Sequence, residues 1–461
     1  MSLSHAIPET TARGVDSDLS RAGPRPRSAC YTPSPVPSRR HLGSLRSSVS
    51  DSWRFRVRWP RAVALVDMNA FFASIEQLDF PELRDRPVAV TNGALGTCII
   101  TCSYEARRFG VHTGMRLREA RGLCPDLVQR SARPQRYAEI STRIMDLLTT
   151  ITPDLEVFSV DEAFLDLTHC QELGSPVGLA RRAQDLILHE TGLPCSVGLS
   201  GDKTTAKYAA KLKKPRGFVV IPPWEARTRL SPVPVTELCG IKNGIGSFLA
   251  ARGVRTCGEM ARLPPSVLTR RFGPPGLRYW LMAQGADPDP VQPSDPRPPR
   301  TLGHGKVTPP GTTERELLTV YFLHMIEKLA ARLRAHDLEA QNFRFATYSR
   351  TTTCEAVHRL AVATNDASVL RPYVTRFLND VWTGQGVDRI HVLALDPRAC
   401  GRQADLWNAP DPRRARLNAA VDAINHRFGP WSVHPAALLE RSPSPDVIAP
   451  AWRPHGVHRS V

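Results

Sequence analysis

FSVDEAFLDLT, residues 158–168, places two adjacent carboxylates, Asp161 and Glu162, between apolar segments at 155–160 and 163–167. Two apolar strands joined so closely predict a β-hairpin with Asp161 and Glu162 at its turn. Two-residue hairpin turns favour Asn-Gly or Asp-Gly, because both central residues take positive φ. Asp-Glu meets neither preference and brings two like charges together. A solvated turn would tolerate this pair, whereas a bound divalent cation would explain it.

A third carboxylate, Asp67, ends the apolar strand predicted at 62–66. Taken alone, such a residue is usually a helix N-cap or a loop residue. If the sheet brings it near Asp161 and Glu162, the three carboxylates can hold two Mg²⁺ ions, since magnesium takes oxygen ligands. With the ions ~3.5–4 Å apart, one would activate an attacking hydroxyl and the other would stabilise a leaving pyrophosphate.

Two groups of residues, a Tyr-Arg pair and a row of lysines, are candidates for phosphate binding. Tyr104 and Arg107 are three residues apart on a predicted helix and share a face. Arg107 can bind phosphate through two parallel hydrogen bonds, although an ordinary exposed helix face is the simpler interpretation. A lysine stripe at 203, 207, 211 and 214 is either a solvated face or a surface for a phosphate backbone. The turn at Pro215 and Gly217 can direct Lys214 inward.

The composition favours a polyanionic partner. The 461 residues carry a net charge of +17. Nucleic acid is the usual partner of so basic a chain, while an arginine-rich composition without such a partner is the alternative. No apolar run approaches the ~18 residues that span a bilayer, and no secretory signal is evident, so no membrane association is expected. The ten cysteines show no zinc-binding spacing, which fits a reducing cytoplasm.

The order of predicted elements favours an α+β fold with several units. Short helices with Gly and Pro follow residue 222, and LCGIKNGIGSFLAARGVR (238–255) predicts a helical hairpin whose backbone N–H groups can bind phosphate. Residues 301–396 predict a β-α-β-β-α-β unit, and a further helix is expected at 412–427. The Ser-, Pro- and Arg-rich residues 1–60 are expected to be disordered.

Taken together, five motifs resemble Y-family translesion DNA polymerases of the DinB/UmuC type. They are VDMNAFFASIE (66–76), SYEARRFGVHTGM (103–115), FSVDEAFLDLT (158–168), AAKLKKPRGF (209–218) and the hairpin near 240. The resemblance covers residues 61–439 and implies low-fidelity, template-directed synthesis on primer-template DNA from dNTPs, with two Mg²⁺ ions. It matches Asp67, Asp161 and Glu162 to the metal-binding triad and the backbone carbonyl of Met68 to a further metal ligand. Phe72 matches the steric gate that excludes the ribose 2′-hydroxyl; a core aromatic is the alternative. Tyr104, Arg107 and Lys214 match the triphosphate contacts.

The same resemblance implies a right-hand architecture with a ferredoxin-like palm, small fingers, a helical thumb and a little-finger domain. The expected boundaries are palm 61–70 and 136–221, fingers 71–135, thumb 222–293 with a helix-hairpin-helix, linker 294–300, little finger 301–396 and C-terminal tail 397–461. A monomer is expected. The resemblance also implies tethering by a sliding clamp, and Gln403, Leu406 and Trp407 fit the form of a clamp-binding peptide. Alternatively, Leu406 and Trp407 pack on the little finger itself.

Three departures from the family pattern stand out. Asn69 replaces the second Asp of the DinB-type motif, although it fits the UmuC type. Lys242 replaces a glycine of the thumb hairpin, so we expect the tight turn to shift to 243–246. The leader has no counterpart in the family core.

Two other functions compete with a polymerase. A non-catalytic Y-family-like DNA-binding accessory protein would lack the acidic triad, and all three carboxylates are present. A nucleotidyl cyclase would explain the carboxylates but not the basic thumb and little finger. Steep salt dependence of duplex binding would separate these classes.

Overall fold

The computed structural model describes residues 58–93, 97–293, 298–401 and 411–439. No helix in these ranges is long and apolar enough to span a membrane. Most of the leader, residues 1–57, lies outside them. So does 402–410, the segment that contains Gln403, Leu406 and Trp407, and the prediction of a clamp-binding peptide stays a prediction.

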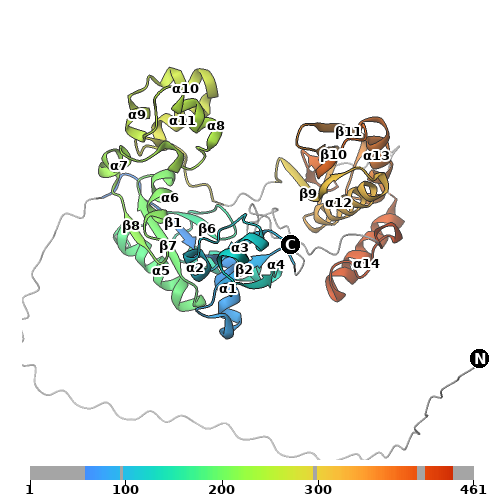
Figure 1. The fold of residues 1–461 in the computed structure, drawn as a ribbon, viewed down its shortest axis with the longest axis horizontal. Helices are drawn as coiled ribbons and strands as arrows, with labels where there is room; N and C mark the ends of the chain where they lie inside the picture. The colour runs from blue at the N-terminus through green and yellow to red at the C-terminus, as the bar shows by residue number, and fades with distance from the viewer. Residues whose placement is uncertain (1–57, 94–96, 294–297, 402–410, 440–461) are drawn as a thin grey trace, which may run out of the picture. The chain divides into compact units, whose positions relative to one another are not determined.

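A five-stranded sheet carries Asp67 and Glu162 on neighbouring strands (Figure 1). Its order is β5-β6-β1-β7-β8. The strands are β1 Val63–Met68, β5 Leu155–Val157, β6 Glu162–Asp166, β7 Cys195–Ser200 and β8 Phe218–Val220. The β7–β8 pair is parallel and the other pairs are antiparallel. The central position of β1 explains why all six of its residues are buried and its sequence is almost wholly apolar.

Helices cover both faces of this sheet. Ala64 and Val66 of β1 belong to the core formed with α4 (Pro134–Thr149) and α5 (Pro176–Thr191). The alternate residues of β1, Val63 and Leu65, pack instead with Ala206 and Ala210 of α6 (Lys203–Leu212). Because side chains alternate along a strand, Asp67 lies on the same face as Val63 and Leu65, which is the face that α6 covers.

Gly198 of β7 allows α6 to approach the sheet closely. A Cβ atom at this position would lie 2.1 Å from the Ala206 carbonyl oxygen and 2.3 Å from the Ala210 amide nitrogen. Both atoms belong to the helix backbone, so no side-chain rotation can relieve the clash. Glycine at 198 therefore fixes the depth at which the lysines of α6 stand over the sheet.

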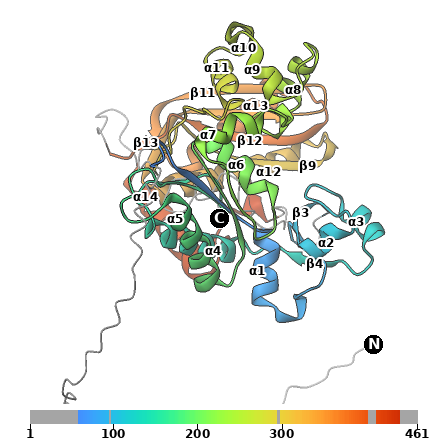
Figure 2. The same ribbon diagram turned by 90° about the vertical axis from the view of Figure 1, so that its left-hand side faces the viewer.

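A second, three-stranded sheet follows the first strand. Its order is β3-β2-β4, with β3 antiparallel and β4 parallel to β2. Figure 2 labels its two outer strands, β3 and β4. The sequence does not predict β4, because its residues VQRS include only one apolar residue. In the structure, none of the four is fully buried. The elements of this region are α1 Phe71–Asp79, η1 Pro81–Leu83, β2 Val88–Thr91, β3 Ile99–Cys102, α2 Tyr104–Arg108, α3 Leu117–Leu123 and β4 Val128–Ser131.

Short helices then form a separate core, as the Gly and Pro punctuation predicts. They are α7 Pro223–Leu230, η2 Val235–Glu237, α8 Asn243–Ala250, α9 Cys257–Arg262, α10 Pro265–Phe272 and α11 Pro274–Met282. The expected shift of the hairpin turn is wrong. Residues 243–246 form the first turn of α8, and Gly240, with φ +85°, makes the turn before it. Lys242 is tolerated because it is an exposed N-cap with extended backbone.

The predicted β-α-β-β-α-β unit is confirmed as a four-stranded antiparallel sheet of order β11-β10-β12-β9. The apolar sides of its two helices pack with the sheet in one core. A short strand, β13, pairs antiparallel with the beginning of β10, and α14 follows close to its expected position. The elements are β9 Thr301–Thr312, α12 Arg315–Ala335, β10 Leu338–Tyr348, β11 Thr353–Thr364, α13 Ala367–Asp380, β12 Val387–Leu395, β13 Arg398–Ala399, α14 Pro412–Phe428 and η3 Ala436–Leu438.

Two expected boundaries are wrong. Trp59, placed in the disordered leader, is buried in the core of the five-stranded sheet, and its amide donates to Gln171 Oε1 (2.8 Å). Val291, placed at the end of the helical thumb, packs with Leu65 on the sheet, and Gln292 N donates to Glu156 Oε2 (2.8 Å). Both segments are polar or proline-rich on average. Their average composition therefore does not reveal that a single apolar residue in each, Trp59 or Val291, is buried in the core.

The close packing of α6 leads to a stability prediction. Gly198→Ala should lower the free energy of unfolding by about 2–3 kcal/mol, because the added methyl forces α6 away from β7. Denaturant titration would measure the change. Gly244→Ala in α8 is the matched control, since nothing lies within 4 Å of a Cβ there. An unchanged stability in Gly198→Ala would contradict the packing described above.

Candidate active site

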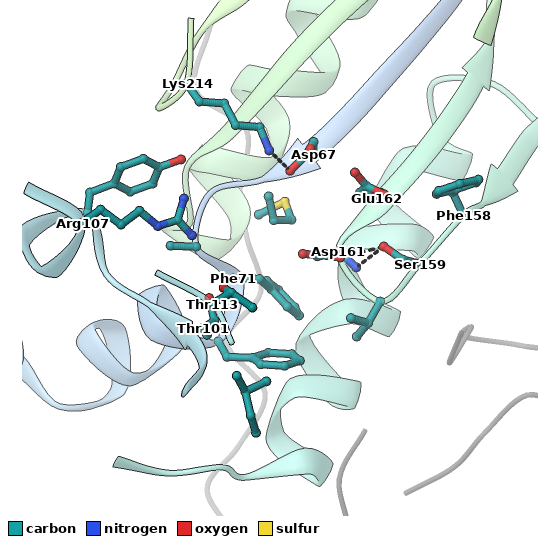
Figure 3. A pocket seen from close by; sticks show the side chains of 16 residues that line it. Asp67, Phe71, Thr101, Arg107, Thr113, Phe158, Ser159, Asp161, Glu162 and Lys214 are labelled. Carbon is teal, nitrogen blue, oxygen red and sulfur yellow. Dashed lines mark hydrogen bonds and ion pairs between the residues drawn. The ribbon is translucent and has the colours of Figure 1, made fainter. Parts of the chain in front are cut away.

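The sheet brings the three predicted carboxylates to one place. Asp67 stands opposite Glu162 in the β1–β6 register. Glu162 lies on the α6 face because Phe164, two residues along β6, packs against α6. Asp161 precedes Glu162, and its backbone carbonyl accepts a hydrogen bond from Met68 N (2.9 Å). All three side chains border one cavity (Figure 3).

The two-residue hairpin turn predicted at Asp161 and Glu162 is wrong. Strand β5 ends at Val157 and Glu162 is the first residue of β6, so the connection is residues 158–161 rather than a two-residue turn. Neither carboxylate residue has positive φ. The connection is closed by Phe158 N and Ser159 N, which both donate to the Glu162 carbonyl (2.9 and 3.1 Å). Glu162 is thus held by strand pairing and not by turn chemistry.

Each carboxylate has a polar partner within the chain. Lys214 Nζ forms an ion pair with Asp67 Oδ1. Lys207 Nζ contacts both oxygens of Glu162, at 2.8 and 2.6 Å. Ser159 Oγ donates to Asp161 Oδ1 (2.6 Å), the contact drawn in Figure 3. Two ammonium groups therefore offset part of the negative charge of the site, and one hydroxyl adds a hydrogen bond.

Burial makes two of these carboxylates, Asp67 and Asp161, more difficult to ionise. It raises the pKa of Asp67 from 3.8 to about 7; Lys214 opposes the rise, while Glu162 and Asp161 add to it. Burial also raises the pKa of Asp161, against the hydrogen bond from Ser159. The Lys214 ion pair alone would lower the pKa of Asp67, so desolvation and like charges outweigh it. An added cation would favour the ionised forms.

The donor set fits a hard divalent cation. Three carboxylates and no thiolate or imidazole border the cavity, and oxygen ligands suit magnesium. Across the described ranges, no three His, Cys, Asp or Glu side chains are grouped as a ready metal site. At this site, both lysines occupy positions next to carboxylate oxygens, so a cation would have to compete with them.

The cavity has a volume of about 670 Å³, and residues of both the five-stranded and the three-stranded sheet line it. Its lining includes every residue predicted from the motifs to act in catalysis or nucleotide binding: Asp67, Met68, Phe72, Tyr104, Arg107, Asp161, Glu162 and Lys214. Asp67 and Arg107 lie 40 residues apart in sequence and still face the same space (Figure 3). The structure therefore collects the separate motifs around one site.

Tyr104 and Arg107 form the wall opposite the carboxylates. They lie on α2, whose N-cap Ser103 accepts a hydrogen bond from Ala106 N. The Arg107 guanidinium stands 4.7 Å from the centre of the Tyr104 ring. The Tyr104 hydroxyl is buried and makes no hydrogen bond to any described residue. A buried hydroxyl without a partner is unfavourable, so this group is suited to an anionic ligand in the cavity.

Phe72 and its neighbour Phe71 have different environments. Phe71 is 3% exposed and part of the core, whereas Phe72 is only partly buried. The Phe72 ring stacks on Tyr137, with centroids 4.3 Å apart and planes 12° from parallel. The Tyr137 hydroxyl donates to Glu76 Oε1 (2.8 Å), and Arg133 Nε also donates to this oxygen (2.8 Å). Phe72 is therefore held firmly at the cavity edge.

Asn69 contributes to the site in a way that sequence patterns miss. Its Nδ2 donates to Ser196 Oγ (2.9 Å), and its Oδ1 accepts from Arg216 N (2.7 Å). It thereby ties the end of β1 to the turn that carries Lys214. Gly217 closes the same turn, where a Cβ would lie 2.2 Å from the Lys213 carbonyl oxygen.

The lysine stripe is neither a uniformly solvated face nor a row of free charges. Lys203 is 6% exposed and contacts Glu156 and Asp289 (both 2.8 Å). Lys207 contacts Glu162, and Lys214 lies beyond the helix against Asp67. Only Lys211, paired with Glu237, is largely exposed among the four. Helical spacing predicts a shared side of α6 but not how deeply each lysine is buried.

The fold is that of a right-hand polymerase, with the five-stranded sheet as palm. A solved Y-family DNA polymerase chimera matches the chain with a TM-score of 0.64 and 24% sequence identity, covering 73% of this chain and 98% of its own. At that identity the likeness shows the fold alone.

Sequence comparisons give the family. The profile of the impB/mucB/samB family matches residues 66–211, and that of its C-terminal domain matches residues 299–406. DNA polymerase IV of Moorella thermoacetica is 36% identical over 392 residues, which cover 82% of this chain and 96% of that protein. DNA polymerase IV of Methanoculleus marisnigri is 32% identical over 75% of this chain and 97% of its own length. The chain belongs to the impB/mucB/samB family of Y-family DNA polymerases.

Proposed function

We propose that this chain is a DNA-directed DNA polymerase of the DNA polymerase IV type, which performs low-fidelity translesion synthesis by metal-dependent nucleotidyl transfer from dNTPs. The observation that carries the proposal is one cavity that three carboxylates share with Tyr104, Arg107 and Lys214, where Lys214 contacts Asp67. Anionic and cationic side chains so arranged suit a metal-bound triphosphate. The polymerase IV relatives match over most of their length, which supports the same chemistry.

Asp67, Asp161, Glu162 and the carbonyl of Met68 would hold two Mg²⁺ ions. When bound, these ions supply activation of the primer 3′-hydroxyl and stabilisation of the leaving pyrophosphate. Tyr104 donates its unpartnered hydroxyl to the triphosphate, and Arg107 and Lys214 neutralise phosphate charge. Lys214 must leave Asp67 to do so, which couples nucleotide binding to release of that carboxylate.

The remaining units would bind primer-template DNA. We assign palm to 61–70 and 136–221, fingers to 71–135, thumb to 222–293 and little finger to 301–396, with Trp59 and the segment 287–292 added to the palm by their packing. The net charge of +17 supports contacts to the phosphate backbone. We further propose that the enzyme acts as a monomer in the cytoplasm, where its nine described cysteines, all free, would stay reduced.

The non-catalytic accessory protein is the weaker alternative. Such a protein has no need of three carboxylates in a partly buried pocket, where burial raises the pKa of Asp67 and Asp161. Burying three carboxylates next to one another costs free energy, and a bound cation would offset that cost. Neither the fold nor the named relatives favour that alternative.

Asp161→Asn tests the proposed function. Loss of a metal ligand should reduce primer extension by roughly 100-fold or more, while primer-template affinity persists through basic surfaces elsewhere. The thermal stabilisation by added Mg²⁺ should also diminish. Asp166→Asn, at the far end of β6, is the control, because this carboxylate accepts a hydrogen bond from Thr168 N (2.9 Å) and lies outside the cavity. Full extension activity in Asp161→Asn would refute the assignment.

Phe72→Ala tests the steric gate. Removing the ring should relax discrimination against ribonucleotides by roughly 10- to 100-fold, with a smaller loss in deoxynucleotide use. Single-nucleotide incorporation with matched dNTP and rNTP would measure the ratio. Ile75→Val, in the same helix and fully buried, should affect stability alone. If Phe72→Ala lowers stability and leaves discrimination unchanged, Phe72 is a core residue.

We also propose that the chain is tethered by a sliding clamp through Gln403, Leu406 and Trp407, because an aliphatic–aromatic pair preceded by a glutamine suits an apolar pocket with a polar edge. Replacing Leu406 and Trp407 by alanine should preserve distributive synthesis and remove stimulation by added clamp on long templates. A lower melting temperature with undiminished clamp stimulation would instead indicate that the pair packs on the little finger.

A further inference from the structure

Lys207 is the lysine of α6 that reaches the carboxylate site. Its ammonium group lies 2.8 Å from Glu162 Oε1 and 2.6 Å from Oε2, so it binds both oxygens of that carboxylate. An ammonium group is a donor only, and these contacts use two of its three N–H bonds. The side chain is 20% exposed, and that of Glu162 is 17% exposed. This is a partly desolvated pair at the edge of the cavity rather than a loose surface contact.

A second contact keeps Lys207 at this position. Its Nζ lies 4.3 Å from the centre of the Phe158 ring, which belongs to the connection between β5 and β6. The face of an aromatic ring attracts a cation, so the ammonium group remains close even when the carboxylate turns away. Phe158 itself packs edge-on against Phe164, with centroids 5.4 Å apart. Lys207 is thus fixed by the same strands that present Glu162.

We propose that Lys207 is a positioning residue for Glu162 that also sets the affinity of the free enzyme for divalent cations. Its ammonium group holds the carboxylate in place while no divalent cation is bound. It also places a positive charge beside the oxygens that a cation would use, so the two compete. The inference rests on the proposed function in one respect, namely that Glu162 is a metal ligand.

The role of Lys207 differs from that of Lys214. Lys214 stands on a turn beside Asp67, opposite Arg107, where a triphosphate would draw it away (Figure 3). Lys207 stands on a helix whose depth is fixed by Gly198, and its head is held by Phe158. We expect it to stay beside Glu162 throughout nucleotide addition. Free enzyme would then bind metal weakly, and tight binding would need the additional negative charge of a nucleotide.

The test uses Mn²⁺ as the probe, because its free concentration can be followed by electron paramagnetic resonance. Lys207→Met keeps the length of the side chain and removes its charge. In the full chain without nucleotide, this variant should bind Mn²⁺ about three- to tenfold more tightly at the Glu162 site. Without metal its melting temperature should fall, since three carboxylates then share one fewer positive charge. Lys207→Arg should restore values close to wild type.

Two control variants isolate the effect. Lys211 lies one turn further along α6 and forms a similar ion pair with Glu237, although both side chains of that pair are nearly half exposed. Lys211→Met breaks this pair. It should leave Mn²⁺ affinity unchanged. In a Glu162→Gln background, adding Lys207→Met should no longer raise the affinity, because the competing pair is already gone. Far-UV circular dichroism would confirm that each variant is folded.

The outcomes separate the two hypotheses. Unchanged or weaker Mn²⁺ binding by folded Lys207→Met would overturn the role of Lys207, whatever the enzyme does with DNA. The same increase in the Glu162→Gln background would also overturn it. Absence of primer extension by the wild-type chain would refute the proposed polymerase function while leaving the effect of Lys207 on Mn²⁺ affinity measurable.

Discussion

The burial of three carboxylates next to one another is the constraint on which this site depends. Burial and neighbouring charges raise the pKa of Asp67 to about 7 even though Lys214 contacts it. The chain supplies two ammonium groups from different elements, Lys207 from α6 and Lys214 from the following turn. Lys214 has a flexible side chain and can leave Asp67 without rearrangement of the backbone, whereas Phe158 keeps Lys207 beside Glu162. A site of this kind stays folded without metal and still accepts it.

The backbone arrangement that permits this exchange begins with strand register. Asp67 faces Glu162 because β1 and β6 pair in register, and both side chains point to the α6 face because of the two-residue period of strands. Gly198 then lets α6 lie close enough for Lys207 to reach Glu162. A shift of one residue in β6 would turn Glu162 to the opposite face. Strand register and one glycine therefore control the electrostatics of the site.

The sequence predicts the cavity residues better than it predicts the reasons for their positions. Asp67, Arg107 and Lys214 each occur in a short continuous sequence motif. A family resemblance therefore assigns their roles directly. The Asp161–Glu162 turn was predicted from local hairpin rules, whereas the position of Glu162 depends on pairing with a strand about 95 residues earlier, as the register Asp67↔Glu162 shows. The burial of Trp59 also depends on a distant contact, with Gln171. Composition and periodicity carry no information about such partners.

Asn69 shows how a departure from a family motif can be understood only from contacts. An aspartate at this position could accept the hydrogen bond from Arg216 N but could not donate one to Ser196 Oγ. Ser196 Oγ also accepts from Gly217 N (3.2 Å), so the amide and the hydroxyl together bind two points of the turn that carries Lys214. A fourth carboxylate would add negative charge beside Asp67, whose pKa is already raised. The amide therefore organises the turn without deepening the repulsion that the two lysines have to balance.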